Sequence, residues 1–211
     1  QTDLLLQYTH ARDKRLTDFG IPALNGRPVN VAAGTYSGSS NAAQDDTTTS
    51  AMQSFTATLN HRFNDDWSVR NVTRLYDYTL DRYDTLPGGT TNPVDMTVGR
   101  TRRFTLRDEK GFFNQTDVTW RNQLGGFKQE WLMGVELGQQ KKQKKRVESV
   151  SGGADRVSIL NPSAAAPVIP AANYNADRAI PSHTTQDTAA LYWQNQITLA
   201  PQWKALIGAR Y

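Results

Sequence analysis

Apolar and polar residues alternate along residues 55–63, and residues 67–75 form a second alternating segment. In the first segment Phe55 and Leu59 fall on odd positions, whereas the even positions are polar. Successive side chains of a β-strand point to opposite sides of a sheet, so each segment predicts a strand with an apolar and a polar face. Residues 64–66, with the sequence Asn-Asp-Asp, predict a tight turn between the two strands.

The segment 127–137 repeats the pattern with charged residues on one face. Lys128, Glu130 and Glu136 share that face, and Trp131 lies on the opposite one. A packed soluble core rarely tolerates so charged a face. The water-filled interior of a transmembrane β-barrel does tolerate it, and such barrels alternate apolar-out and polar-in. The pattern therefore predicts an all-β, antiparallel transmembrane barrel. It predicts that one set of residues faces lipid, namely Leu59, Val69, Val118, Met133 and Ile197. A second set is predicted to face the lumen, namely Thr58, Arg70, Arg74, Thr119, Lys128 and Gln196.

Seven strands follow from the alternation and from the turn residues. They are expected at about 3–13, 50–63, 67–80, 112–121, 127–139, 186–199 and 203–211. The short connections are 64–66, 122–126 and 200–202, and the long ones are about 14–49, 81–111 and 140–185. Transmembrane barrels show this alternation, because their periplasmic turns are short and their extracellular loops are long. Aromatic residues flank the short turns, as in the girdles at a lipid–water boundary: Phe63, Trp67, Trp120, Phe127 and Trp203.

Composition narrows the class of protein further. No apolar run approaches the roughly 18–20 residues that a membrane-spanning helix needs, which excludes a helical membrane protein. The chain has no cysteine, so thiol catalysis, cysteine-bound zinc and disulfides are excluded. The net charge of +4 arises from 24 basic and 20 acidic residues, and so small an excess argues against a nucleic-acid partner.

The 211-residue chain begins directly before the strand expected at about 3–13 and ends inside the one expected at about 203–211. We therefore expect residues 1–211 to be an internal fragment of a larger barrel domain. Seven strands cannot close alone, since closure requires strand number, tilt and shear to agree. The expected structure is an open, curved antiparallel sheet with long extracellular loops.

Three segments, 12–27, 59–74 and 191–211, resemble the barrel of TonB-dependent siderophore receptors, and most closely the ferric-catecholate branch. The resemblance covers essentially the whole chain. It implies about seven strands of a 22-stranded barrel in the outer membrane of a Gram-negative bacterium, which takes up ferric siderophore with energy delivered through TonB. It also implies a plug domain inside the barrel. We expect the plug, the TonB box and the C-terminal strands to lie outside these residues.

Cationic and aromatic residues gather where the second long connection meets the strand before it. The candidate ligand-binding residues are Tyr78, Arg82, Tyr83, Arg102 and Arg103. Ferric catecholates carry negative charge and aromatic rings, so arginine and tyrosine suit them physically. We expect Tyr78, Tyr83, Arg102 and Arg103 to converge above the lumen on the extracellular side. The alternative is an ordinary solvated, charged loop.

The densest run of charge is cationic and follows the strand expected at 127–139. Its members are Lys141, Lys142, Lys144, Lys145 and Arg146. At the level of the outer-leaflet headgroups these side chains would meet the phosphates of lipopolysaccharide. Ligand steering and a merely solvated strand extension stay open as alternatives.

No residue pattern indicates a protein-bound metal, a cofactor or catalysis. His10, His61 and His183 lie in distant segments without carboxylates at a ligand spacing. Iron would arrive as the siderophore complex and would need no protein ligand. Adjacent acids such as Asp65 and Asp66 point apart on an extended chain, so they cannot share acid–base work. The chain is therefore not expected to be an enzyme.

Two other classes of protein share part of this pattern. A passive outer-membrane porin or a structural barrel has the same strands, but three long loops within seven strands favour a receptor that closes over a ligand. A secreted β-sandwich that binds carbohydrate would have to bury Lys128, Glu130 and Glu136, which is costly.

Overall fold

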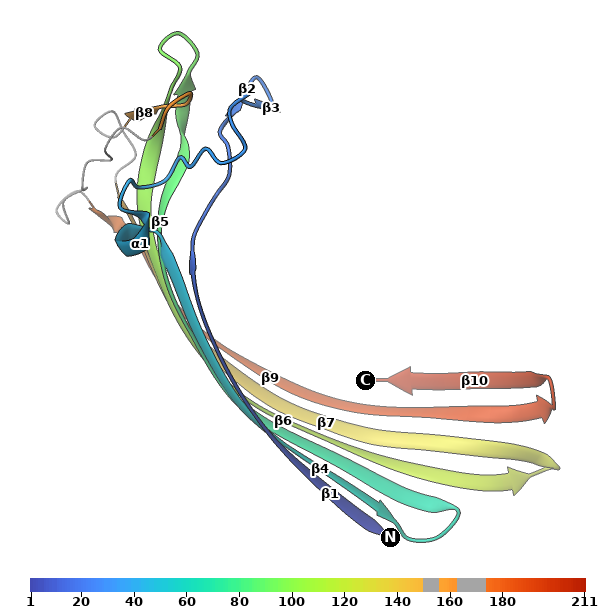
Figure 1. Ribbon diagram of the computed structural model, residues 1–211. Helices are drawn as coiled ribbons and strands as arrows, with labels where there is room; N and C mark the ends of the chain where they lie inside the picture. Colours follow the sequence, from blue (N-terminus) through green and yellow to red (C-terminus); the bar gives the residue numbers. More distant parts are fainter. Residues whose placement is uncertain (150–155, 163–173) are drawn as a thin grey trace.

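The computed structural model describes residues 1–149, 156–162 and 174–211. One long, curved antiparallel sheet has the strand order β1-β4-β5-β6-β7-β9-β10 (Figure 1). Its strands are β1 (Thr2–Leu16), β4 (Thr47–Arg62), β5 (Trp67–Asn92), β6 (Thr97–Leu124), β7 (Phe127–Ser149), β9 (Tyr174–Ala200) and β10 (Trp203–Arg210). The remaining elements are β8 (Arg156–Ser158), which pairs with β6, the helix α1 (Ala42–Asp45), and the hairpin of β2 (Ala23–Leu24) and β3 (Arg27–Pro28).

The seven long strands confirm the predicted fold class, a fragment of an antiparallel barrel. Among the described residues, β1 and β10 each pair with a single neighbour, so the sheet is open. The short turns gather at one end of the sheet, and α1, β2, β3 and β8 lie at the other (Figure 1). We name these the short-turn end and the long-loop end.

The register of the sheet confirms the predicted division into two faces. Residues directly opposite each other in an antiparallel pair point to the same face. One face, the apolar face, carries the residues predicted to contact lipid: Leu59, Val69, Val118, Met133 and Ile197. The other, the polar face, carries those predicted to face the lumen: Thr58, Arg70, Thr119, Lys128 and Gln196. In a transmembrane barrel these faces contact lipid and water respectively.

Five successive cross-strand rows make up an apolar belt on the apolar face. The row nearest the short-turn end contains Trp67 and Trp120, whose rings stack with centroids 5.3 Å apart. The row nearest the long-loop end contains Leu75 and Phe112. On β5 the belt covers residues 67–75, close to the roughly 9–11 residues that a transmembrane strand needs.

Charged side chains of the polar face pair with one another across strands. Arg121 lies 2.8 Å from Glu130, and Arg210 lies 2.8 Å from Glu136. Each such partly exposed pair contributes little to the stability of the fold. Together they give the polar face a hydrated surface, as expected for the wall of a lumen.

Two of the connections predicted as long loops are largely strand. Because β5 continues to Asn92 and β6 begins at Thr97, the predicted loop 81–111 contains only the short connection 93–96. Strands β7 and β9 likewise extend into the predicted loop 140–185, part of which lies outside the described residues. Beyond the belt neither face of the sheet contacts lipid hydrocarbon, so the apolar alternation stops although the backbone ladder continues. The alternation therefore marks the membrane-spanning part of each strand and not its full length.

Two of the short turns are stabilised by local features of their sequences. The side-chain Oδ1 of Asn64 accepts hydrogen bonds from the backbone N–H groups of Asp66 (2.9 Å) and Trp67 (2.8 Å). Gly125 and Gly126 have φ values of +60° and +84°, which glycine adopts without steric cost and which a two-residue hairpin turn requires.

A small apolar cluster lies at the long-loop end. Val98, Val157 and Ile159 are buried there, and Val29 packs against them. Val98 lies opposite Val157 in the β6–β8 pair, so the cluster holds β8 against the β5–β6 hairpin. No helix among the described residues has the length and apolar content needed to cross a membrane.

A charge in the middle of the apolar belt is expected to destabilise the complete protein in lipid. Val135 lies in the third of the five rows, so Val135→Arg should lower the free energy of unfolding by about 2–4 kcal/mol. Met133→Arg, one row nearer the short-turn end, should cost less. The matched control Gln194→Arg lies on the polar face and should have little effect. Urea unfolding of the complete protein in bilayers measures these values, and equal effects at Val135 and Gln194 would contradict the assignment of faces.

Candidate ligand-binding site

A hollow on the polar face lies over β4, β5 and β6, at the level where the apolar belt ends. Its volume is about 290 Å³, and it is lined by Met52, Arg74, Tyr76, Tyr78, Arg107, Glu109 and Phe113. All seven side chains lie on the polar face, according to the register of the β4–β5 and β5–β6 pairs. We name this site the inner hollow.

Cross-strand register brings the lining of the inner hollow together. Arg74 lies opposite Phe113, and Tyr78 lies opposite Glu109, in the β5–β6 pair. Met52 lies opposite Tyr78 in the β4–β5 pair. Residues paired in this way have Cβ atoms about 4.5–5.5 Å apart, so three strands form one continuous surface.

The ring of Tyr76 lies directly over Gly111, its cross-strand neighbour. A Cβ atom on Gly111 would lie only 2.2 Å from Cε1 of Tyr76, so the glycine leaves the room that the ring occupies. The ring is nearly parallel to that of Phe113, with an interplanar angle of 4° and centroids 6.3 Å apart. Nε2 of Gln140 donates a hydrogen bond of 2.7 Å to the Tyr76 hydroxyl. These contacts hold two rings at a defined position and orientation on the wall.

Two guanidinium groups lie near the rings of the inner hollow. Cζ of Arg107 is 4.9 Å from the ring centroid of Tyr78, and Cζ of Arg74 is 6.0 Å from that of Tyr76. Oε1 of Glu109 lies 3.1 Å from Nε of Arg107. The hollow thus holds two cations and one anion beside aromatic rings. Such a surface suits an anion that also carries flat, apolar groups.

Of the predicted binding residues, Tyr78 lines the inner hollow, whereas Arg82 and Arg103 lie nearer the long-loop end. Both arginines contact Asp84, each with Nε 3.1 Å from a carboxylate oxygen. The ring of Phe19 lies against the two guanidinium groups, 4.9 and 5.4 Å away. Asp84 is fully buried, and burial raises the pKa of its carboxyl although Arg103 and Arg82 both act to lower it. The two arginines therefore belong to a packed ionic cluster that fastens the chain after β1.

The expected convergence of the predicted side chains does not occur at Tyr83 and Arg102. Both belong to the apolar-face register, continued beyond the belt. Tyr83 packs against Phe104 with ring centroids 6.2 Å apart, and a nitrogen of Arg102 lies 3.1 Å from a carboxylate oxygen of Asp45 in α1. The error follows from treating 81–111 as a loop. In a strand, neighbours such as Arg102 and Arg103 point to opposite faces.

Six of the seven residues that line the inner hollow lie outside the predicted set of binding residues. Alternation predicts the polar-face position of Arg74, but it does not mark Tyr76, Glu109 and Phe113 as binding residues. On β5 the sequence does indicate a shared cationic and aromatic face, because Arg70, Arg74, Tyr76 and Tyr78 all fall on even positions. The sequence of β6 alone does not show which of its residues lie opposite the arginine and tyrosines of β5, because that depends on the pairing register.

The cationic run at 141–146 is divided between the two faces. Lys142, Lys144 and Arg146 belong to the polar face. Lys141 and Lys145 belong to the apolar-face register beyond the belt. Arg146 donates a hydrogen bond of 2.9 Å to Glu148. The run therefore presents two separate sets of cations, one on each face.

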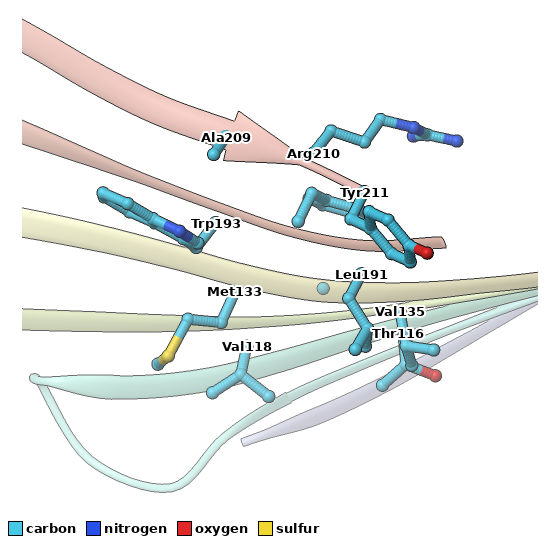
Figure 2. Close-up of a pocket in the computed structure, with 11 residues that line it drawn as sticks. Thr116, Val118, Met133, Val135, Leu191, Trp193, Ala209, Arg210 and Tyr211 are labelled. Atoms are coloured by element: carbon cyan, nitrogen blue, oxygen red, sulfur yellow. The ribbon is translucent and has the colours of Figure 1, made fainter. Parts of the chain in front are cut away.

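A second hollow lies on the apolar face, over β6, β7, β9 and β10 (Figure 2). Val118, Met133, Leu191 and Trp193 line it, and Figure 2 shows Leu191 next to Tyr211, with Trp193, Met133 and Val118 farther from that ring. Because this face of a barrel contacts lipid, the hollow offers no water-filled binding site. The inner hollow remains the better candidate for a soluble ligand.

Gly111→Ala is expected to disturb the inner hollow through Tyr76. The added Cβ would overlap the ring, and overpacking of this kind costs about 1–3 kcal/mol of folding stability. In a Tyr76→Ala background the same substitution should cost much less, because the overlap is gone. A double-mutant cycle on urea unfolding of the complete protein measures the coupling. Additive effects would contradict the contact.

Comparison with known proteins places this fold in a family. The family model described as "TonB dependent receptor-like, beta-barrel" matches residues 1–211. The "Metal-pseudopaline receptor CntO" of Pseudomonas aeruginosa is 24% identical over 211 residues, which are 100% of this chain and 28% of that protein.

Solved structures show the same fold. The siderophore receptor PiuA of Acinetobacter baumannii superposes with a TM-score of 0.81 at 20% identity, over 99% of this chain and 32% of that one. The open form of the ferric-catecholate import receptor Fiu of E. coli K12 gives 0.78 at 20% identity, over 99% of this chain and 34% of that one. The chain thus spans about a third or less of the proteins it resembles. With the whole of residues 1–211 matched by the family model and the predicted two-faced sheet confirmed, the chain belongs to the TonB-dependent receptors and forms part of their β-barrel.

Proposed function

We propose that this chain is part of an outer-membrane receptor of a Gram-negative bacterium that takes up ferric siderophores with energy from TonB. The observation that carries the proposal is the inner hollow, where Arg74 and Arg107 lie against the rings of Tyr76 and Tyr78 on the polar face. The protein acts as a transporter and not as an enzyme. Its plug domain and the TonB protein are the partners that this function requires.

The charge of the polar face favours an anionic ligand. On β5, β6 and β7, from the inner hollow to the long-loop end, seven cationic side chains share this face with three acidic ones. The cations are Arg74, Arg82, Arg103, Arg107, Lys142, Lys144 and Arg146, and the acids are Asp84, Glu109 and Glu148. A concave wall with an excess of one sign raises the local concentration of oppositely charged ligands.

The similar proteins support a metal chelate as the ligand. Their names specify a metal-pseudopaline complex, siderophores, and ferric catecholates. In the parts of the chain that the structure describes, no cluster of three or more histidine, aspartate or glutamate side chains could hold a metal ion. We propose that iron is recognised through its organic ligand, since the names of the similar proteins refer to chelates. The alternative, a passive porin, has no support among the similar proteins.

We further propose that the apolar-face members of the cationic run contact lipopolysaccharide. Lys141 and Lys145 lie beyond the apolar belt on the side of the sheet that faces lipid. Lys141 is directly opposite Lys110, whose ammonium group lies 3.2 Å from a carboxylate oxygen of Asp77. Lipid phosphates at that level supply the opposite charge.

Removing both arginines of the inner hollow is expected to weaken siderophore binding. Arg74→Gln with Arg107→Gln, made in the complete receptor, should cost about 1.5–3 kcal/mol of binding free energy for each charged hydrogen bond that is removed. The weakening should be larger at low ionic strength, where exposed charges are less screened. The matched control is Arg121→Gln, on the same face but at the short-turn end. Calorimetric titration with a ferric catecholate measures the affinities.

Equal affinity in the double variant and the parent, in receptor that inserts normally, would remove the inner hollow from the proposed function. An equal decrease in the Arg121→Gln control would show a general effect of charge and not a binding site.

The lipopolysaccharide contact is tested by a pair of matched variants. Lys141→Gln with Lys145→Gln should reduce the lipopolysaccharide that copurifies with the complete receptor, since each cation near a lipid surface is worth about 1 kcal/mol. Lys142→Gln with Lys144→Gln changes the same charge on the polar face and should leave the copurified amount unchanged. Equal amounts in both variants, measured by phosphate analysis, would contradict the proposal.

A further inference from the structure

Four polar side chains lie in the middle of the apolar belt. Asn71 and Thr73 belong to β5, and Asn114 and Thr116 belong to β6. All four are in the apolar-face register, where Asn71 is opposite Thr116 and Thr73 is opposite Asn114. They occupy the second and third of the five rows from the long-loop end. Polar groups at this depth are costly, because hydrocarbon offers them no hydrogen-bond partner.

These four side chains satisfy one another completely. Nδ2 of Asn71 donates to Thr116 (2.7 Å) and to Asn114 (3.3 Å), and Nδ2 of Asn114 donates to Thr73 (2.7 Å) and to Asn71 (3.3 Å). The hydroxyls of Thr73 and Thr116 donate to the Oδ1 atoms of Asn71 (3.1 Å) and Asn114 (3.3 Å). Every side-chain N–H and O–H of the group is thus used inside it. We name the group the Asn–Thr square.

Apolar side chains surround the Asn–Thr square on the same face. Leu75 and Phe112 form the row toward the long-loop end, and Val69 and Val118 form the row toward the short-turn end. No charged group lies in either row of the β5–β6 pair. The square therefore depends on its own pairing for every hydrogen bond.

Alternation of apolar and polar residues does not fix the pairing of β5 with β6 by itself. A slip of one residue moves every side chain to the wrong face, but a slip of two residues restores the faces. After a slip in one direction Asn71 would face Val118 and Asn114 would face Leu75. After a slip in the other direction Thr73 would face Phe112 and Thr116 would face Val69. Either slip removes the matching partners of two polar groups within hydrocarbon.

We propose that Asn71, Thr73, Asn114 and Thr116 are positioning residues that lock the register of β5 and β6 inside the membrane. The Asp77–Lys110 ion pair is exposed and adds little. The stack of Trp67 on Trp120 acts at one end of the belt, whereas the Asn–Thr square acts in its middle.

The lock determines the geometry of the inner hollow. Arg74 pairs with Phe113, and Tyr78 with Glu109, across the same two strands. A two-residue slip would shift one strand by about 7 Å along the other and separate these pairs. This consequence for the inner hollow rests on the proposed function, whereas the register lock itself does not.

Cysteine cross-linking reads the register directly, because the 211-residue sequence has no cysteine. In the complete receptor in its membrane, Ser68→Cys with Thr119→Cys reports the observed pairing, since these residues are opposite each other. Ser68→Cys with Arg121→Cys, or with Asp117→Cys, reports a slip of two residues in either direction. Cysteines that the remainder of the receptor contains would be replaced by serine beforehand.

The test variant replaces the square by apolar residues of similar size: Asn71→Leu, Thr73→Val, Asn114→Leu and Thr116→Val. It leaves the belt apolar but removes the pairing preference. The shifted cross-links are expected to rise at least several-fold, and siderophore binding to fall with them. The rescue variant exchanges the residue types, Asn71→Thr, Thr73→Asn, Asn114→Thr and Thr116→Asn. It keeps asparagine opposite threonine, so the parental cross-link pattern is expected.

If the apolar variant formed the Ser68–Thr119 cross-link without any increase in the shifted cross-links, the register lock would be overturned. If the apolar variant does not insert, Asn71→Leu with Thr116→Val removes one pair of the square and should give an intermediate increase in shifted cross-links. Parental cross-linking in this second variant would also overturn the lock. The cross-links need no ligand, so a shifted pattern together with unchanged siderophore binding would contradict the role of the inner hollow and leave the lock standing.

Discussion

Backbone hydrogen bonding in a medium without water is the constraint on which the rest of this structure depends. In hydrocarbon every N–H and C=O group has to find its partner within the protein. The β5–β6 ladder satisfies this without interruption from Trp67 to Pro87. Once the ladder is continuous, the sequence controls which side chains occupy the two faces and how far one strand is shifted along the next.

The backbone hydrogen-bond ladder continues beyond the belt, where backbone groups no longer lie in hydrocarbon. This places paired strands, and not loops, at the level of the inner hollow and beyond it. The inner hollow lies at the transition, since Arg74 and Tyr78 are on the polar face while the apolar face changes from Leu75 to charged Asp77. Farther out, the ring of Phe19, in the chain after β1, packs against Arg82 and Arg103, which are ion-paired with Asp84. The scaffold of the candidate site is therefore the barrel wall itself.

Pairwise contacts between side chains decide what the continuous ladder leaves open. Gly111 leaves room for the Tyr76 ring, and Glu109 holds Arg107 near Tyr78 on the neighbouring strand. The Asn–Thr square has the same character on the opposite face, because its partners match in only one register. Each of these arrangements joins β5 to β6, and each depends on the shape or the hydrogen bonding of particular residues.

The sequence by itself determined the class of fold, the seven strands, the short turns and the face of each residue within the belt. It could do so because lipid on one side and water on the other impose a period of two, which is visible in the order of apolar and polar residues. For the same reason the positions of Arg74 and Tyr78 on the polar face could be predicted from the sequence. Only the tertiary structure decided the length of the strands beyond the belt, because no hydrocarbon imposes a period of two on the sequence there. It also decided which residues meet across strands: Tyr76 and Phe113 line the inner hollow, whereas Tyr83 and Arg102 lie in the register of the opposite face. Alternation fixes a side chain's face, whereas its neighbour on the next strand depends on register, which is a property of the assembled sheet.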